Sequence, residues 1–131
     1  MIPIVFINCR SVPYLDMIID GRKTIETRTR NTLRNMVGRR VLLAETGNGK
    51  PVVRCSAVIR SARPIYDRKI WDSLRRKHRV PKGGQHDWKP ETKVKYCYEI
   101  AVVVECRPFT PPEDVRHGRV WMEYNKEERR Y

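Results

Sequence analysis

The sequence has no long apolar run, since its longest one is Ile100–Val104. A helix that crosses a membrane needs about 20 consecutive apolar residues, so we expect no membrane-spanning segment. The N-terminal stretch 1–7 also lacks the charged flank and the cleavage site of a secretory signal. The chain is therefore expected to be cytoplasmic, with no membrane among its partners.

Metal-binding and redox motifs are lacking too. The four cysteines are Cys9, Cys55, Cys97 and Cys106. They are far apart and form no Cys-x-x-Cys pair, the spacing that zinc sites and redox dithiols use. We expect them to be small core residues in strands, and the sequence predicts neither a metal site nor a cofactor.

Histidine is scarce and shows no pattern of catalysis. His78, His86 and His117 lack metal-ligand spacing, and the sequence indicates no serine or cysteine partner for any of them. We expect all three to lie at the surface. No catalytic triad is assigned.

Acidic residues are in the minority, with 15 Asp and Glu against 28 Lys and Arg and a formal net charge of +13. The excess is concentrated in two segments. Residues 21–40 carry seven basic side chains and one acidic one, and residues 67–82 carry seven and two, whereas residues 113–131 carry five of each. A positive field of this kind attracts polyanions, so RNA or a nucleotide-derived ligand is the expected partner. The alternative is a basic surface that only keeps the protein soluble.

The chain is long enough for one domain with a modest core. Apolar and β-branched runs predict strands over Pro3–Asn8, Thr24–Arg28, Val41–Glu45, Val52–Ile59 and Tyr96–Arg107. In the last strand, Tyr98, Ile100, Val102 and Val104 are expected to share one face. Residues 46–51 are rich in turn formers and predict a hairpin loop.

Two short helices are expected between the strands. The first is opened by Pro13 and closed by Gly21. A second helix is expected over Asp67–Arg79, with Asp67 as its N-cap. Its buried residues should be Ile70, Trp71 and Leu74. Many strands with two inserted helices favour a mainly β, α+β fold, namely a small and partly closed barrel.

The prolines of residues 108–113 predict a linker. We therefore expect a domain over residues 1–110 and a tail over 111–131 that packs on the domain or extends it. In the tail, Trp121, Met122 and Tyr124 fit a short strand or helix that covers the barrel, or a dimer contact. The sequence leaves this choice and the oligomeric state open.

Residues 21–28, GRKTIETR, resemble the Gly-x-Lys-x-x-Glu-x-Arg signature of the ASCH family. As in that family, the motif follows a short helix, and a weaker resemblance extends over most of residues 1–110. It implies a PUA-like barrel whose cleft, lined by Lys23, Glu26 and Arg28, binds RNA or modified nucleosides. Independently of the family, Glu26 and Arg28 are two apart on a strand, so they point to one face and can pair or share a ligand. On residue types alone, the alternative is that Glu26 and Arg28 only neutralise each other on the barrel wall while Lys23 is solvated. Lys23 is expected to bring its ammonium to the mouth of the cleft.

Some small bacterial ASCH proteins are N4-acetylcytidine amidohydrolases, with a threonine nucleophile at the position matching Glu26 and an assisting glutamate on a middle helix. This chain departs at both places, because it carries Glu26 and only Asp67 and Asp72 as acids on the middle helix. An acyl-enzyme on threonine is therefore not expected. Other members look like ribonucleases that act on single-stranded RNA.

Several aromatic residues could stack on a base, of which Trp88 is the leading candidate because its loop is polar and lacks apolar periodicity. Trp71 is expected in the core. The expected ligand-binding residues are Lys23, Glu26, Arg28, Arg22, Arg30, Arg68, Arg75, Trp88 and Tyr98. If the protein is an enzyme, Lys23 and Glu26 are the expected catalytic residues.

The first functional hypothesis is an RNA- or nucleotide-binding domain with a basic cleft. The second is a hydrolase on the same fold, either a ribonuclease or an amidohydrolase of a modified nucleoside, because a fold alone does not separate binding from catalysis. A protein-interaction module is the third.

Overall fold

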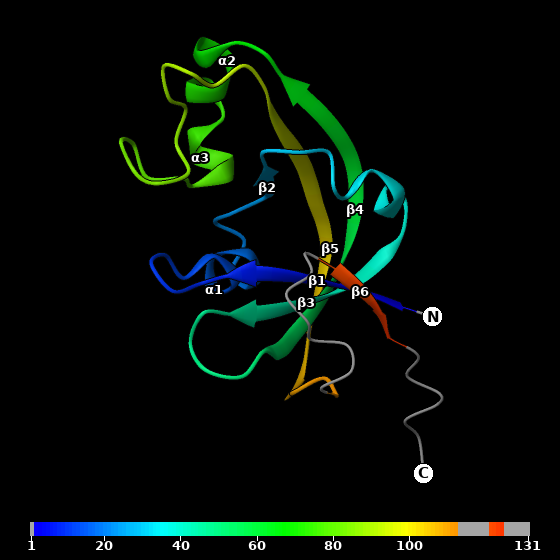
Figure 1. Cartoon of the computed structure of the whole chain (residues 1–131). Coiled ribbons are helices and arrows are strands. Elements are labelled where there is room, and N and C mark those ends of the chain that lie inside the picture. The colour runs from blue at the N-terminus through cyan, green and yellow to red at the C-terminus, as the bar shows by residue number, and fades with distance from the viewer. Residues whose placement is uncertain (1, 113–120, 125–131) are drawn as a thin grey trace.

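A computed structural model of the chain describes residues 2–112 and 121–124, and six strands form its single sheet (Figure 1). The strands are β1 (Ile2–Asn8), β2 (Ile25–Arg28), β3 (Arg40–Thr46), β4 (Val52–Ile65), β5 (Lys95–Phe109) and β6 (Trp121–Tyr124). The helices are α1 (Tyr14–Ile19), α2 (Arg68–Ser73), α3 (Arg75–His78) and a 3-10 turn, η1 (Arg34–Met36). The expected mainly β fold with short helices is confirmed.

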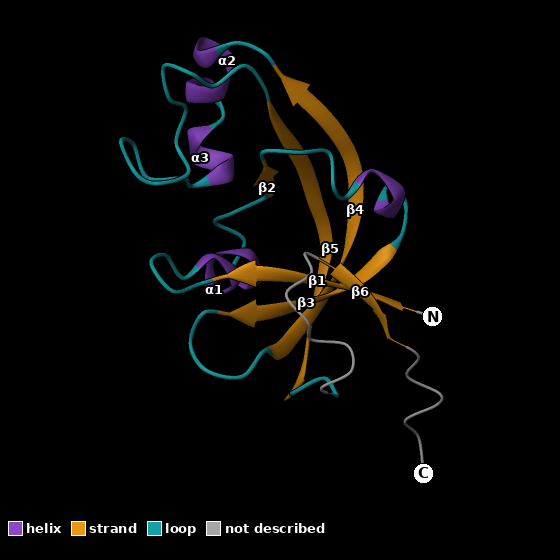
Figure 2. Ribbon diagram, viewed as in Figure 1, coloured by secondary structure: helices purple, strands orange, loops and turns teal. Residues whose placement is uncertain are grey.

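The sheet has the order β2-β5-β4-β3-β1-β6. Only β1 and β3 pair in parallel, and the other neighbours are antiparallel. Figure 2 shows the long strands β4 and β5 bending so strongly that the sheet curls into part of a barrel. This curl brings β2 towards β1, although three strands separate them in the sheet.

One main core fills the inside of the curled sheet. Strand β4 alternates buried and half-buried residues from Val52 to Ile59, the pattern of a strand with one face on a core. Helix α1 closes the core by burying Tyr14, Leu15 and Ile18. It ends as expected at Gly21, whose φ of +84° lies in the left-handed region that glycine adopts without strain.

Strand β5 lies in the middle of the sheet, but its expected face pattern fails after Ile100. Val102 has φ +48° and is 54% exposed, while Val103 packs against the main core. The pairing with β4 shifts register between Ser56 and Val58, opposite this point. A bulge therefore turns Val102 and Val104 outward, because one extra residue reverses the alternation of side chains. The strand also runs through Pro108, so the expected linker begins later.

The expected single helix over residues 67–79 is two helices that break at Leu74. Asp67 is the N-cap, as expected, and accepts a hydrogen bond from the Lys69 N–H. The rings of Trp71 and His78 stack with centroids 4.1 Å apart. Seven residues of continuous helix would separate them by about 10 Å along the axis, so the stack requires a break. Ile70, which was expected in the core, is exposed as a result, whereas Trp71 is fully buried.

Residues 121–124 form a strand that pairs antiparallel with β1, from Ile2↔Tyr124 to Val5↔Trp121. Of the alternatives expected for residues 121–124, the structure has the short strand. Tail residues 113–120, His117 among them, and 125–131 lie outside the described residues, and the division into domain and tail at residue 110 stays a prediction.

No helix in the described ranges is both long and apolar enough to span a membrane.

Candidate functional site

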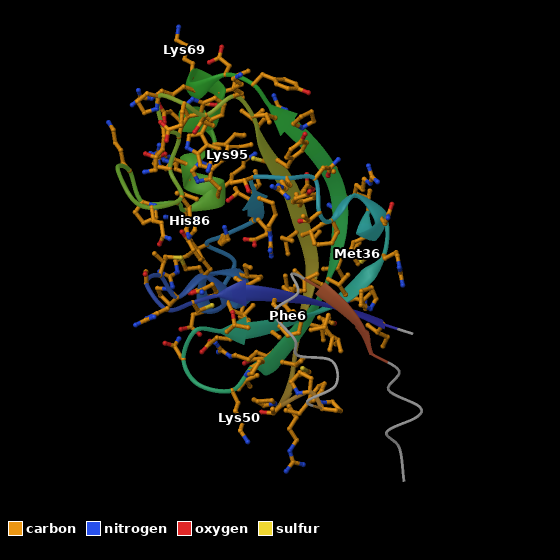
Figure 3. The ribbon with its side chains drawn as sticks, in the orientation of Figure 1. Phe6, Met36, Lys50, Lys69, His86 and Lys95 are labelled. Carbon is orange, nitrogen blue, oxygen red and sulfur yellow. The ribbon has the colours of Figure 1, made fainter. Side chains whose placement is uncertain are left out.

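A cleft of about 790 Å³ opens where the curled sheet brings β1 and β2 together. Its walls come from β1, β2 and the residues after it, α1, the β3–β4 hairpin, and the end of the loop before β5. The residues that line it are Phe6, Ile7, Asn8, Tyr14, Lys23, Glu26, Thr27, Arg28, Thr29, Arg30, Thr32, Thr46, Pro51, His86 and Lys95. In Figure 3, Phe6 marks the β1 wall, and His86 and Lys95 mark the opposite one.

Three charged residues of the motif, Lys23, Glu26 and Arg28, meet at this cleft. The Glu26 carboxylate lies between two cations, with Oε2 3.0 Å from Arg28 Nη2 and Oε1 3.5 Å from Lys23 Nζ. Glu26 is only 7% exposed. The pairing of Glu26 with Arg28, expected from their spacing on one strand, is confirmed. A carboxylate has about four lone-pair positions, so two cations leave room for further donors.

Lys23 differs from expectation, because its ammonium lies at the buried floor of the cleft and not at its mouth. The residue is 2% exposed, and Nζ donates to the carbonyl oxygens of Ile25 at 2.7 Å and His78 at 2.6 Å. The ammonium therefore has two carbonyl acceptors and Glu26 as its ion-pair partner. Burial lowers the pKa of Lys23, and the charge of Glu26 opposes that change. This arrangement ties the motif to the end of α3.

Arg28 bridges the two strands that border the cleft. Its Nη2 donates to the Phe6 carbonyl of β1 at 3.0 Å. Two buried polar atoms near this bridge, Arg28 Nε and Thr32 Oγ1, have no hydrogen-bond partner among the described residues. Both residues line the cleft. Such atoms are uncommon in folded proteins, and they are frequent where a ligand or water completes the network.

Tyr14 is a cleft residue that the sequence did not indicate. Its ring lies 4.5 Å from Lys23 Nζ in a cation–π contact. Burial, together with the charge of Glu26, raises the pKa of Tyr14 to about 12. The phenol is therefore protonated at neutral pH and can donate a hydrogen bond. The position of Tyr14 on the helix directly before the motif is the only sequence signal that could have pointed to it.

Of the other expected basic residues, only Arg30 lines the cleft. Arg22 pairs with Asp20 on the surface. Arg68 and Arg75 lie in the α2–α3 region, where Asp72 pairs with both of them. These three residues are therefore not among those that line the cleft.

The two expected aromatic residues also lie elsewhere. Trp88 is half-buried and packs near Trp71, with ring centroids 6.3 Å apart, so its polar loop does not leave it open to solvent. Tyr98 is fully buried, and its hydroxyl accepts from the Leu33 N–H and donates to Asn31 Oδ1. Neither is among the residues that line the cleft.

A second buried network, which the sequence did not reveal, supports the α2–α3 region behind the cleft. Asp87 accepts hydrogen bonds from Trp71 Nε1 at 2.7 Å, Gly83 N–H at 2.8 Å and Arg75 Nη2 at 3.0 Å. Burial alone would raise the pKa of Asp87, but these hydrogen bonds outweigh it and hold the pKa below its usual range. Asp87 thereby fixes the loop that precedes β5.

His78 was expected at the surface, but it is fully buried in this network. Its Nδ1 accepts from the Val80 N–H and its Nε2 lies 3.0 Å from the Trp71 carbonyl oxygen, which assigns the neutral Nε2–H tautomer. Burial lowers the pKa of His78 to about 4. His86 is exposed, as expected, and borders the cleft.

The same loop brings Lys95 to the cleft. Lys95 Nζ donates to the His86 carbonyl at 2.9 Å and lies 5.4 Å from the Trp71 ring centroid. Within residues 2–112 and 121–124, no three His, Cys, Asp or Glu side chains lie close enough together to hold a metal ion. The polar groups that the cleft offers to a ligand are its cations, the Glu26 carboxylate, and the hydroxyl and amide groups around them.

Comparison with known proteins agrees with this fold. The family model of the ASCH domain matches residues 11–113. The crystal structure of an ASCH protein from Zymomonas mobilis is similar, with a TM-score of 0.75 and 17% identity over 97% of this chain and 90% of that chain. A tyrosine-to-phenylalanine variant of that protein has the same TM-score and identity, and covers 97% of this chain and 92% of that one. A serine-to-alanine variant matches at a TM-score of 0.71 and 18% identity, over 97% and 90%.

No curated protein matches the sequence. The match to the family model nevertheless covers most of the chain, and the motif of residues 21–28 lies inside it. The mainly β, partly closed barrel with short helices that the sequence led us to expect is confirmed by the similar structures. The chain belongs to the ASCH domain family.

Proposed function

We propose that the cleft binds single-stranded RNA or a nucleotide-derived ligand, with Glu26 as the carboxylate that orients it. The ASCH family is PUA-like and generally associated with nucleic acids, which supports this kind of partner. Four cations and one acid line the cleft, a balance that favours an anionic ligand. The cytoplasmic location stays a prediction from the sequence.

The observation that carries the proposal is the position of Glu26 between Lys23 and Arg28 on the cleft wall. A carboxylate held in this way can accept a hydrogen bond from the exocyclic amine of a base, the contact by which Asp and Glu read cytosine. Arg30, at the same wall, is suited to a ligand phosphate.

A hydrolase is the second candidate, because the same carboxylate could activate water for attack on RNA or on an acylated nucleoside. In that case Lys23, which already has two carbonyl acceptors and Glu26 as partners, would act as an electrostatic support for Glu26 and not as a base. Thr24 is not among the residues that line the cleft, whereas Thr27 is. Because Glu26 is the one acid among the residues that line the cleft, it is the candidate for the general base.

Replacing Glu26 by glutamine is expected to weaken binding of a ten-nucleotide oligocytidylate by about tenfold or more, since a hydrogen bond to a charged group is worth about 1.5–3 kcal/mol. Glutamine keeps the shape and removes the charge. The matched control is Glu99→Gln, because Glu99 is exposed on β5 and forms a surface ion pair with Arg60. That control should change the affinity less than twofold. Fluorescence anisotropy measures both.

Equal affinities of the two variants would refute the role of Glu26. Turnover separates the two candidate functions, and it should be assayed with the oligocytidylate and with N4-acetylcytidine. Loss of turnover in Glu26→Gln with binding retained would establish the hydrolase. Weakened binding with no turnover in the wild type is the result that we expect.

A further inference from the structure

The segment between β4 and β5, residues 66–94, carries a second charged surface next to the cleft. We call this segment the insertion. It contains α2, α3 and the loop fixed by Asp87. The exposed basic residues of the insertion include Arg76, Lys77, Lys82 and Lys93.

Three of the four acids of the insertion are engaged within it, and the fourth, Glu91, is exposed. Asp72 pairs with Arg75 and Arg68, and Asp87 is buried against Arg75. Asp67 caps α2 through the Lys69 N–H. Arg76, Lys77, Lys82 and Lys93 form no ion pair with any described residue. Arg75 alone therefore pairs with both Asp72 and Asp87. The outward face of the insertion, by which we mean the exposed side chains of residues 76–93, keeps a net positive charge.

This face adjoins the cleft through direct contacts. The Thr24 N–H donates to the Lys77 carbonyl at 2.9 Å, and Arg79 Nε donates to the Arg22 carbonyl at 3.0 Å. The segment that starts at Lys77 thus lies against the motif, and it reaches the cleft wall at His86. In Figure 1, α3 and the loop after it lie on the side to which the arrowheads of β1 and β3 point. Lys77 and Lys82 belong to this bordering segment.

The insertion also holds in place the backbone that carries its exposed cations. Trp71 and His78 stack in its core, Asp87 ties Trp71 to the loop, and Lys23 Nζ joins α3 to the motif at 2.6 Å. A fixed array of cations loses less conformational freedom when phosphates bind than a mobile one does. The buried contacts of the insertion thus favour phosphate binding at its surface, because they keep the backbone under the cations fixed.

We propose that the outward face of residues 76–93 is a second phosphate-binding surface, continuous with the cleft, so that the preferred ligand is a single-stranded RNA of several nucleotides and not a free nucleotide. This inference rests on the proposed function, and it assigns to the cleft the one nucleotide whose base Glu26 contacts. The surface then binds the phosphates that follow it along the strand. A single strand fits better than a duplex, because only an unpaired base can leave its stack to enter the cleft.

The test compares a double variant, Lys77→Ala with Lys82→Ala, with a control, Arg34→Ala with Arg107→Ala. The control removes two exposed cations from η1 and from the far end of β5. Binding of cytidine 5′-monophosphate and of the ten-nucleotide oligocytidylate is measured at several salt concentrations. Because the Lys77 and Lys82 side chains are exposed, thermal unfolding should show that the variant is folded like the wild type.

For the oligonucleotide, the double variant should reduce the slope of log affinity against log salt by about 1.4, since each phosphate contact on a single strand contributes about 0.7. Its affinity for the mononucleotide should stay within twofold of the wild type, and the control should leave the slope unchanged. An unchanged slope in the double variant would overturn the proposed surface while the cleft assignment stands. An equal loss for both ligands would also overturn it, because the two lysines would then act inside the cleft. If neither ligand binds the wild type, the proposed function fails and the surface fails with it.

Discussion

Replacement of Lys23 by methionine is expected to lower the free energy of unfolding by about 3–5 kcal/mol, the range for removing one member of a buried ion pair. Methionine has similar length, so the packing of the aliphatic chain is kept. The ammonium is lost, which leaves the carbonyl oxygens of Ile25 and His78 without their donor. It also leaves Glu26 with Arg28 as its remaining ion-pair partner. Buried acceptors without a donor are what make such a change severe.

Urea denaturation measures this effect, with Lys93→Met as the control. Lys93 is exposed and forms no ion pair with the described residues, so its replacement should change the free energy of unfolding by less than about 0.5 kcal/mol. If Lys23→Met is as stable as this control, the ammonium has no structural role. It would then be available to a ligand, as the sequence alone led us to expect.

The second large effect concerns pH. The folded protein holds His78 neutral, with its pKa lowered by burial to about 4. The ordinary pKa of about 6.5 applies once the chain unfolds. Between these two values the unfolded state binds a proton that the folded state does not, so stability falls as the pH is lowered. From about pH 7.5 to about pH 5, His78 alone should reduce the free energy of unfolding by about 2 kcal/mol.

The His78→Gln variant isolates this contribution, because glutamine cannot titrate. Its stability at neutral pH can differ from the wild type, so the quantity to compare is the change in unfolding free energy over that pH range. The wild type should lose about 2 kcal/mol more than the variant. Equal losses would mean that a different group titrates, and that His78 is not the buried neutral residue described here. Carboxylates such as Asp87, whose pKa is also lowered, contribute only at lower pH, as the pH falls through about 4 and below.

Local patterns were sufficient to predict much of the fold. Strand alternation identified the positions of five strands to within a few residues, except that β4 extends to Ile65. The spacing of Glu26 and Arg28 predicted their ion pair. Both inferences depend on the geometry of a single strand, which the order of residues determines. The family motif added the PUA-like fold.

Features that depend on contacts between distant residues were missed. The break at Leu74 follows from the stacking of Trp71 on His78, and the outward turn of Val102 follows from a bulge opposite β4. The burial of Lys23 depends on the His78 carbonyl, which is 55 residues away in the sequence. Asp87 gave no signal, because its partners come from a helix and a loop that only tertiary packing brings together.

An NMR titration of the backbone amides with cytidine 5′-monophosphate tests the central claim, that the cleft around Glu26 is the ligand site. The account predicts shifts at Thr27, Arg30, Thr46 and His86, which line the cleft on different elements. These shifts should saturate together with one dissociation constant, and in Glu26→Gln the same shifts should need about ten times the ligand concentration or more. Shifts that spread over the exposed cations without saturating, and leave the cleft amides unmoved, would contradict it.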